Sequence, residues 1–139
     1  MQVKDAMHPG VRWVEPKTPL TEIAQLMRRH NIGAIPIGEN DRLIGIVTDR
    51  DIVCRGLSQG LDLTRAIASD VMTLGIYYTT EAADVTDAAV IMETHRIRRL
   101  PVINDQTRMT GMLSIGDLSH GGHRDLCGEV LNVVAARAA

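Results

Sequence analysis

Residues 45–52 read GIVTDRDI, and residues 111–118 repeat the pattern as GMLSIGDL. Both copies place a hydroxyl residue three positions after a glycine, and an aspartate three positions after the hydroxyl residue. Further out, HNIGAIPI at residues 30–37 is matched by HRIRRLPV at residues 95–102. A repeat of this length is typical of duplicated supersecondary units that bury their apolar faces against each other. The duplication therefore predicts two copies of one fold, and two copies of any cleft in it.

The composition is that of a globular protein without a strong charge. The chain has 139 residues, 45% hydrophobic and 23% charged, which suits one compact domain or two tightly paired halves. A formal net charge of −2 and a near absence of aromatic residues disfavour nucleic-acid binding, which needs basic fields and stacking platforms. No apolar run approaches the roughly 20 residues that span a bilayer, and the first residues lack the apolar stretch of a signal peptide. We therefore expect a cytoplasmic protein that does not enter membranes.

Helical periodicity occurs at the same place in both repeats. Apolar residues recur at i, i+3, i+4 and i+7 from Leu20 and again from Val85, which predicts two amphipathic helices. Thr18, with Pro19 at the first helical position, and Asp84 are the expected N-caps. Two further helices are predicted at residues 51–57 and 124–138.

Short apolar segments bounded by turn residues predict the strands. Their ranges are 11–15, 34–37 and 43–48 in the first repeat and 100–103 and 109–114 in the second. Pro36 and Pro101 each lack a donor N–H, so the strands that carry them are expected at sheet edges. The order strand, helix, strand, strand, helix predicts an α+β fold. Its expected parts are residues 1–60 and 66–122 as the two repeats, followed by a C-terminal helix within 123–139.

The strand–helix junction near the end of each repeat is the strongest candidate for a ligand site. Thr48 ends a predicted strand, Asp51 lies in the first turn of the next helix, and Ser114 and Asp117 repeat the pair. A helix N-terminus offers free N–H groups to phosphate, a hydroxyl can donate to a phosphate or sugar oxygen, and a carboxylate accepts from ribose hydroxyls. Such residues often serve only as caps, but two copies at matching positions favour the ligand interpretation.

Two arginines form a less specific candidate site. Arg98 and Arg99 precede a predicted strand at the place where the first repeat has Gly33 and Ala34. The arginines suit phosphate, and the small pair leaves room for a flat base. A solvated turn that carries two surface charges explains the arginines as well, and composition does not separate the two interpretations.

Metal binding and catalysis have little support in the sequence. His120, His123 and Cys127 lie within eight residues, but their spacing matches no closed zinc pattern and a fourth ligand is missing. A glycine-rich bend followed by a helix is therefore favoured. Cys54 and Cys127 form no Cys-x-x-Cys pair, and buried thiols are expected. The sequence offers no nucleophile–base set and no phosphate-binding glycine loop, so no enzymatic activity is expected.

With these motifs in place, the sequence resembles the CBS domain family, and the duplicated chain resembles a Bateman module, the tandem pair of such domains. The resemblance extends from Val3 to about Leu118. It rests on Asp-x-Met at the start of each copy, on the Ile-Pro-Ile and Leu-Pro-Val strands, and on the glycine-to-aspartate segment quoted above. Residues 47–52 are especially similar to stand-alone bacterial members of the hypoxic-response type. The resemblance implies two βαββα units whose sheets pack about a pseudo-two-fold axis, with clefts that bind AMP, ADP, ATP or S-adenosylmethionine.

The resemblance also implies that each cleft takes residues from both repeats. One cleft would combine residues 72–77, including Tyr77, with Thr48, Arg50, Asp51, Ile97, Arg98, Arg99 and Pro101. The other would combine residues 7–12, including Met7 and Arg12, with Ile32, Gly33, Ala34, Pro36, Ser114, Gly116 and Asp117. Since the first cleft has more arginines, it is predicted to bind a nucleotide more tightly.

Together these observations predict an adenine-nucleotide-binding regulatory module without a catalytic cofactor. Because no effector domain is attached, its output is expected to pass to a separate effector protein. The alternatives are a homodimeric interaction scaffold with empty clefts, a binder of S-adenosylmethionine and, with least support, a small enzyme. A homodimer is expected, since the predicted helices offer more apolar surface than the two sheets of one module can cover.

Overall fold

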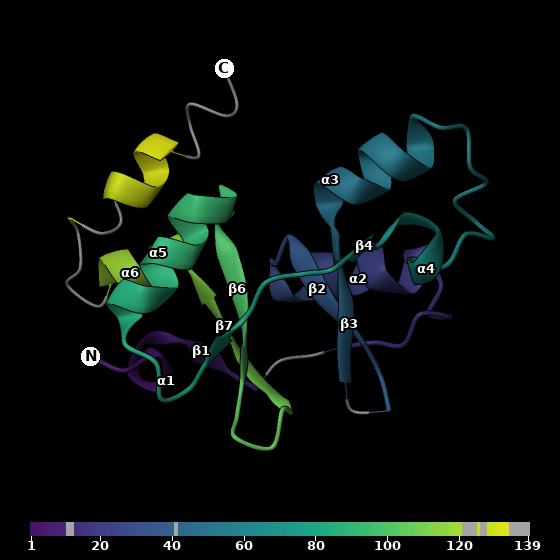
Figure 1. Ribbon diagram of the computed structural model, residues 1–139. Coiled ribbons are helices and arrows are strands. Elements are labelled where there is room, and N and C mark those ends of the chain that lie inside the picture. Colours follow the sequence, from purple (N-terminus) through teal and green to yellow (C-terminus); the bar gives the residue numbers. More distant parts are fainter. Residues whose placement is uncertain (11–12, 41, 121–124, 126–127, 134–139) are drawn as a thin grey trace. The chain divides into compact units, whose positions relative to one another are not determined.

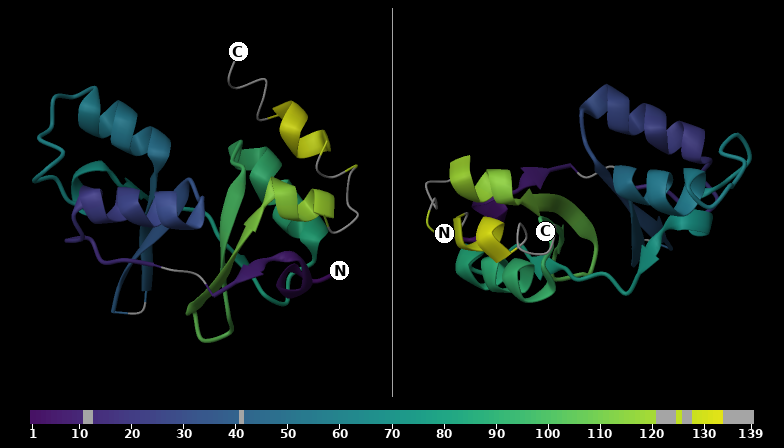
Figure 2. Two further views of the ribbon diagram at one scale, coloured as in Figure 1. Left: turned by 180° about the vertical axis from the view of Figure 1, so that it is seen from behind. Right: turned by 90° about the horizontal axis from the view of Figure 1, so that it is seen from above.

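The chain folds into two compact units in the computed structural model (Figure 1). The residues that the structure describes are 1–10, 13–40, 42–120, 125 and 128–133. One unit consists of Met1–Val11 with Tyr77–Ala139, here the 77–139 unit, and the other of Arg12–Ile76, here the 12–76 unit. Each unit combines a β-sheet with helices, as Figure 2 shows from two further directions. The α+β class expected from the sequence is therefore confirmed.

The 12–76 unit contains a three-stranded antiparallel sheet in the order β2-β3-β4. Its strands are β2 (Ala34–Glu39), β3 (Arg42–Thr48) and β4 (Thr73–Leu74). Its helices are α2 (Leu20–His30), α3 (Asp49–Asp51), the π-helix η1 (Ile52–Leu57) that continues α3, and α4 (Ala68–Val71). The apolar face of α2 packs on the hairpin of β2 and β3, and the buried core includes Leu20, Ile23, Ile35, Ile37 and Val47.

The 77–139 unit contains a four-stranded sheet in the order β1-β7-β6-β5. Its strands are β1 (His8–Pro9), β5 (Thr79–Thr80), β6 (Arg99–Ile103) and β7 (Met109–Ser114), with β5 parallel to β6. Its helices are α1 (Val3–Ala6), α5 (Val85–His95) and α6 (Ile115–His120), and residues 128–133 are also helical. Val130 from this last segment is buried in one core with Met92, Leu100 and Leu113.

Each sheet takes one short strand from the start of the other repeat. β1, from the start of the first repeat, pairs with β7, and β4, from the start of the second, pairs with β3. In both of these strand pairs, the short strand passes next to a glycine of its partner strand. A Cβ built on Gly111 would lie 2.8 Å from the carbonyl oxygen of His8, and one on Gly45 would lie 2.9 Å from that of Thr73. Glycine at these two positions lets the backbones approach this closely.

Several elements lie where the sequence places them. β7 has the predicted bounds, and the helix predicted after Asp84 is α5. Oδ1 of Asp84 accepts the amide of Thr86 at 2.8 Å, which confirms this N-cap, and the same amide lowers the pKa of Asp84. β2 and β3 extend one or two residues beyond their predicted bounds.

The predicted cap at Thr18 is wrong. α2 begins at Leu20 with Pro19 in the N-cap position, and no side-chain hydrogen bond caps the helix. The amide of Leu20 donates instead to the carbonyl oxygen of Ala66 at 3.0 Å. A backbone contact from a distant part of the unit therefore satisfies a helix amide for which a side-chain cap was expected.

Only one of the two proline-containing strands is an edge strand. β2, which contains Pro36, is at the edge of its sheet, whereas β6, which contains Pro101, lies between β7 and β5. The edge position predicted for Pro101 is therefore wrong. β5 pairs with Val102 and Ile103, so the parallel pairing begins after the residue that lacks an N–H.

Three predicted elements differ in form or extent. The strand predicted at residues 11–15 is a single parallel bridge between Val14 and Ile37, and the ring of Trp13 packs closely over Gly38 next to it. Residues 11–12 lie outside the described residues. The helix predicted at 51–57 is a π-helix over most of its length. The helix predicted at 124–138 is helical at 125 and 128–133, and its other residues lie outside the described part.

Candidate functional site

The Ser114–Asp117 junction connects β7 to α6. The amide of Ser114 donates to Oδ2 of Asp117 at 2.8 Å, and the amide of Asp117 donates to Oγ of Ser114 at 3.2 Å. This reciprocal pair is a capping box, which satisfies amides at the helix start that have no partner within the helix. Only 7% of the Asp117 side chain is exposed, so its carboxylate is held in one orientation.

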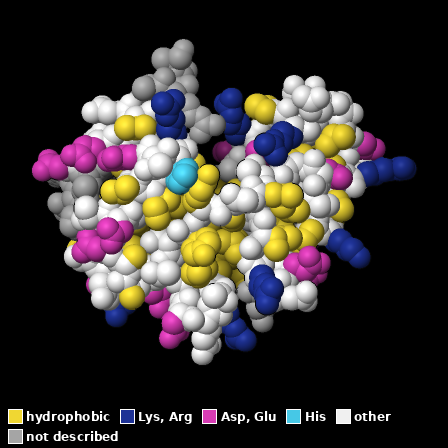
Figure 3. Space-filling view, in the orientation of Figure 1, with side chains coloured by type: hydrophobic (Ala, Val, Ile, Leu, Met, Phe, Trp, Pro, Cys, Tyr) yellow, Lys and Arg dark blue, Asp and Glu magenta, His cyan; other side chains and the backbone are white. Residues whose placement is uncertain are grey.

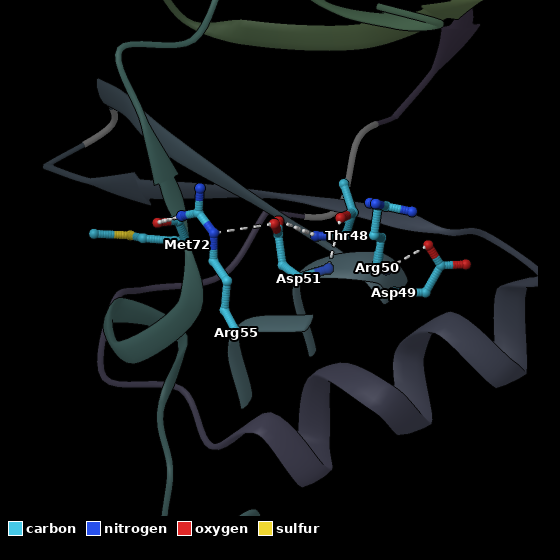
Figure 4. Close-up of polar contacts among 6 residues, drawn as sticks. All are labelled: Thr48, Asp49, Arg50, Asp51, Arg55 and Met72. Carbon is cyan, nitrogen blue, oxygen red and sulfur yellow. Dashed lines mark hydrogen bonds and ion pairs between the residues drawn. The ribbon is translucent and has the colours of Figure 1, made fainter. Parts of the chain in front are cut away.

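The Thr48–Asp51 junction between β3 and α3 has the same geometry (Figure 4). The amide of Thr48 donates to Oδ2 of Asp51 at 2.9 Å, and the amide of Asp51 donates to Oγ1 of Thr48 at 3.0 Å. Both junctions therefore act as caps. Each cap uses Oδ2 of its aspartate, and Oδ1 of the same carboxylate faces another group.

The two Oδ1 atoms face different basic side chains. Oδ1 of Asp117 lies 2.8 Å from Nδ1 of His8, on β1, and Oδ1 of Asp51 lies 3.8 Å from Nε of Arg55, on η1. Nη1 of Arg55 also donates to the carbonyl oxygen of Met72 at 3.3 Å (Figure 4). Sequence reasoning did not single out His8 or Arg55, because neither is repeated in the other copy. The i+4 spacing of Arg55 from Asp51 was the one available signal.

A cavity of about 670 Å³ lies beside the Ser114–Asp117 junction. One wall is residues 5–9, from α1 to β1, and the other is Ser114, Gly116 and Asp117. Met7 belongs to the first wall. The structure thus brings four of the predicted ligand-binding residues together around one space.

β2 and β6 begin beside the junction of their own repeat. Ala34 is paired with Thr48, and Arg99 is paired with Ser114. The amide of Asp49 donates to the carbonyl oxygen of Gly33, and the amide of Ile115 donates to that of Arg98, both at 3.0 Å. The side chains of Arg98 and Arg99 are exposed, whereas Gly33 and Ala34 occupy the equivalent place in the 12–76 unit. The two arginine charges therefore lie at the surface of the 77–139 unit, and their role in binding stays a prediction.

Other predicted residues are engaged within their own units. The ring of Tyr77 stacks on His95, with ring centroids 3.4 Å apart and an interplanar angle of 11°, so one face of the tyrosine is covered. Ile97 packs against the core of the 77–139 unit. Pro36 and Pro101 are buried in their strands.

The remaining predicted residues lie at the surface or outside the described part. Arg50 is exposed on α3, and its amide donates to Oδ1 of Asp49 at 2.9 Å. Ile32 is exposed after the end of α2, and Arg12 lies outside the described residues. The predicted clefts combine residues of the two units, and that combination stays a prediction.

The described residues contain no candidate metal centre. Within 1–10, 13–40, 42–120, 125 and 128–133, no three His, Cys, Asp or Glu side chains are grouped so that they could hold a metal ion. Cys54 is exposed on η1, so the expectation that this thiol is buried is wrong. Cys127, His123 and the side chain of His120 lie outside what the structure describes.

Among the residues that the structure describes, no helix is long and apolar enough to cross a membrane.

Two α+β units, each with a hydroxyl–aspartate capping box between a strand and a helix, define this protein as a tandem of CBS-type domains. The CBS domain profile matches residues 3–56 and 68–122, and the chain belongs to the CBS domain family. The resemblance drawn from the repeated motifs is therefore confirmed.

Three comparisons illustrate the range of the similarity. Hypoxic response protein 1 of Mycobacterium tuberculosis is 43% identical over 117 residues, which cover 84% of this chain and 81% of that protein. A crystal structure of Hypoxic Response Protein I with two coordinated zinc ions has 41% identity and a TM-score of 0.79, and covers 86% of this chain and 98% of that chain. The crystal structure of the CBS domain pair of protein MJ0100, in complex with 5-methylthioadenosine and S-adenosylmethionine, has 25% identity and a TM-score of 0.79. It covers 90% of this chain and 98% of that chain.

Proposed function

We propose that this protein is a regulatory module that binds an adenosine-containing ligand and signals to a separate effector protein. The observation that carries the proposal is the cavity of about 670 Å³ with Ser114 and Asp117 on its wall. Small-molecule sites have volumes of about 300–1,000 Å³. A hydroxyl and a carboxylate suit the oxygens of phosphate and ribose. The adenosine compounds bound to the CBS domain pair of MJ0100 support this class of ligand, within which AMP, ADP, ATP and S-adenosylmethionine are the candidates.

The proposal assigns binding and no catalysis to these residues. The hydroxyl of Ser114 and the carboxylate of Asp117 each accept a backbone amide, and they do not form a nucleophile–base pair with one another. The second candidate is an interaction scaffold whose function is its protein surface and whose clefts bind no nucleotide.

Ligand-dependent stability separates the two candidates. We expect an adenosine compound at 100 times its Kd to raise the free energy of unfolding by about 2.7 kcal/mol, because it binds the folded state alone. Urea unfolding with and without AMP, ADP, ATP or S-adenosylmethionine measures this shift. GMP at the same concentration is the control, because it differs from AMP in the base and tests whether adenine is recognised. If none of the adenosine compounds shifts the transition, the scaffold replaces the sensor.

A homodimer is the proposed assembly. Large apolar side chains are exposed on two helices: Val53 and Leu57 on η1 are 54% and 62% exposed, and Val90 on α5 is 54% exposed. Figure 3 shows apolar side chains among the charged ones at the surface. Association would remove such side chains from water. Light scattering at micromolar concentration is expected to give about twice the chain mass of 15.2 kDa, and the mass of a single chain throughout that range would contradict the proposal.

A further inference from the structure

Arg55 distinguishes the Thr48–Asp51 junction from the equivalent junction in the second repeat. It lies on η1, four residues after Asp51. In the alignment of the two repeats the matching position is Gly121, which has no side chain. At this position of the repeat, a long cationic side chain is therefore present in the first copy and absent from the second.

The guanidinium of Arg55 bridges two segments of the 12–76 unit. Nη1 donates to the carbonyl oxygen of Met72 at 3.3 Å, and Nε lies 3.8 Å from Oδ1 of Asp51. Figure 4 shows the guanidinium between these two groups. Met72 immediately precedes β4, and Asp51 ends α3, so one side chain connects the strand segment to the junction.

In the 77–139 unit the matching segments enclose the cavity. Met7 matches Met72 in the repeat, and Asp117 matches Asp51. Both Met7 and Asp117 line the space of about 670 Å³. The guanidinium of Arg55 therefore lies between the two segments whose counterparts line the cavity in the 77–139 unit.

A ligand at the Thr48–Asp51 junction has to compete for the same atoms. Oδ2 of Asp51 accepts the amide of Thr48, so Oδ1 is the oxygen left for ribose hydroxyls, and Arg55 faces it. His8 also contacts Oδ1 of Asp117, at 2.8 Å, but its side chain is 81% exposed and the cavity lies beside it. The Arg55 side chain is 54% exposed, and it also donates to the carbonyl oxygen of Met72. The two junctions thus differ in the side chain that faces Oδ1 and in the bond from that side chain to the Met72 carbonyl oxygen.

We propose that Arg55 determines which junction binds the ligand: its guanidinium fills the Thr48–Asp51 site from within the chain, so that the Ser114–Asp117 cavity binds first. This inference rests on the proposed function. It reverses the ranking based on the number of arginines, because a guanidinium engaged with Asp51 and Met72 occupies the place of the ligand.

Isothermal titration calorimetry with AMP tests the role of Arg55. Asp117→Ala removes the ribose acceptor of the cavity, which leaves Thr48–Asp51 as the remaining site. In this background, Arg55→Ala is expected to raise the affinity for AMP about three- to tenfold, the factor expected for removing a partly exposed ionic contact and one hydrogen bond. Arg65→Ala removes the same charge from the same unit and is the control. The Arg65 side chain is 89% exposed and lies next to Asp62, so its removal is expected to leave the affinity unchanged.

Each contrary result has a separate meaning. An unchanged affinity in the double variant would overturn the inference, and a lower affinity would make Arg55 a ligand contact and overturn it too. Binding of AMP by the wild-type protein would in both cases leave the proposed function standing. If no variant and no wild-type protein binds AMP or S-adenosylmethionine, the inference and the proposed function both fall. Asp117→Asn, which keeps an acceptor for the Ser114 amide, replaces Asp117→Ala if the latter does not fold.

Discussion

Asp117→Ala is expected to lower the affinity of the protein for AMP at least about tenfold. The Asp117 carboxylate is 7% exposed, and the Ser114 amide fixes its orientation on the cavity wall. Hydrogen bonds to a charged group contribute about 1.5–3 kcal/mol each, and about 1.4 kcal/mol corresponds to a tenfold change in Kd. Calorimetric titration of the wild-type protein and the variant with AMP measures the difference.

The same substitution also removes a helix cap, and its effect on binding has to be separated from its effect on stability. Loss of a capping side chain costs about 0.5–2 kcal/mol of stability. Asp84→Ala is the matched control, because Asp84 caps α5 through the Thr86 amide and does not line the cavity. We expect Asp84→Ala to lower the stability and keep the affinity. Equal affinities for Asp84→Ala and Asp117→Ala would show that the cavity is not the binding site.

Sequence alone predicts the elements whose partners lie close together in the chain. The short apolar segment at residues 109–114, bounded by turn residues, predicts β7, and the aspartate ahead of a helical pattern predicts the cap at Asp84. The capping boxes of Thr48 and Ser114 join residues three positions apart, so they follow from spacing as well. In all of these cases the local pattern contains both partners of the interaction.

Contacts between distant segments account for what the sequence did not predict. The amide of Leu20 is satisfied by Ala66, and Arg55 reaches the carbonyl of Met72. β1 and β4 each pair with a strand of the other repeat, which no periodicity within a repeat indicates. Ile52–Leu57 spans little more than one turn, too short for apolar spacing to separate a π-helix from an α-helix. The hydroxyl–aspartate pairs of the two junctions were therefore easier to predict than the side chains from other segments that contact them.

Gly111→Ala is expected to destabilise the protein by about 1–3 kcal/mol, the usual range for an overpacked site. A Cβ at this position would lie 2.5 Å from Sδ of Met7 and 2.8 Å from the carbonyl oxygen of His8. The flexible Met7 side chain can move aside, but the carbonyl belongs to β1, which has to shift against β7. Urea unfolding should show a lower midpoint with an unchanged m-value.

Two other glycines separate a local clash from a general effect of alanine. Gly128 is helical, and among the described residues a built Cβ meets no atom within 4 Å outside its own helix backbone, so Gly128→Ala is expected to keep or slightly raise the stability. Gly45→Ala would place its Cβ 2.9 Å from the carbonyl oxygen of Thr73 and should destabilise the protein much as Gly111→Ala does. The two variants are expected to differ in their affinity for AMP. Met7 and His8, which face Gly111, line the cavity, so Gly111→Ala should also weaken AMP binding there, whereas Gly45→Ala should not. If the two variants lost affinity equally, the cavity wall formed by β1 would not be the surface that AMP contacts.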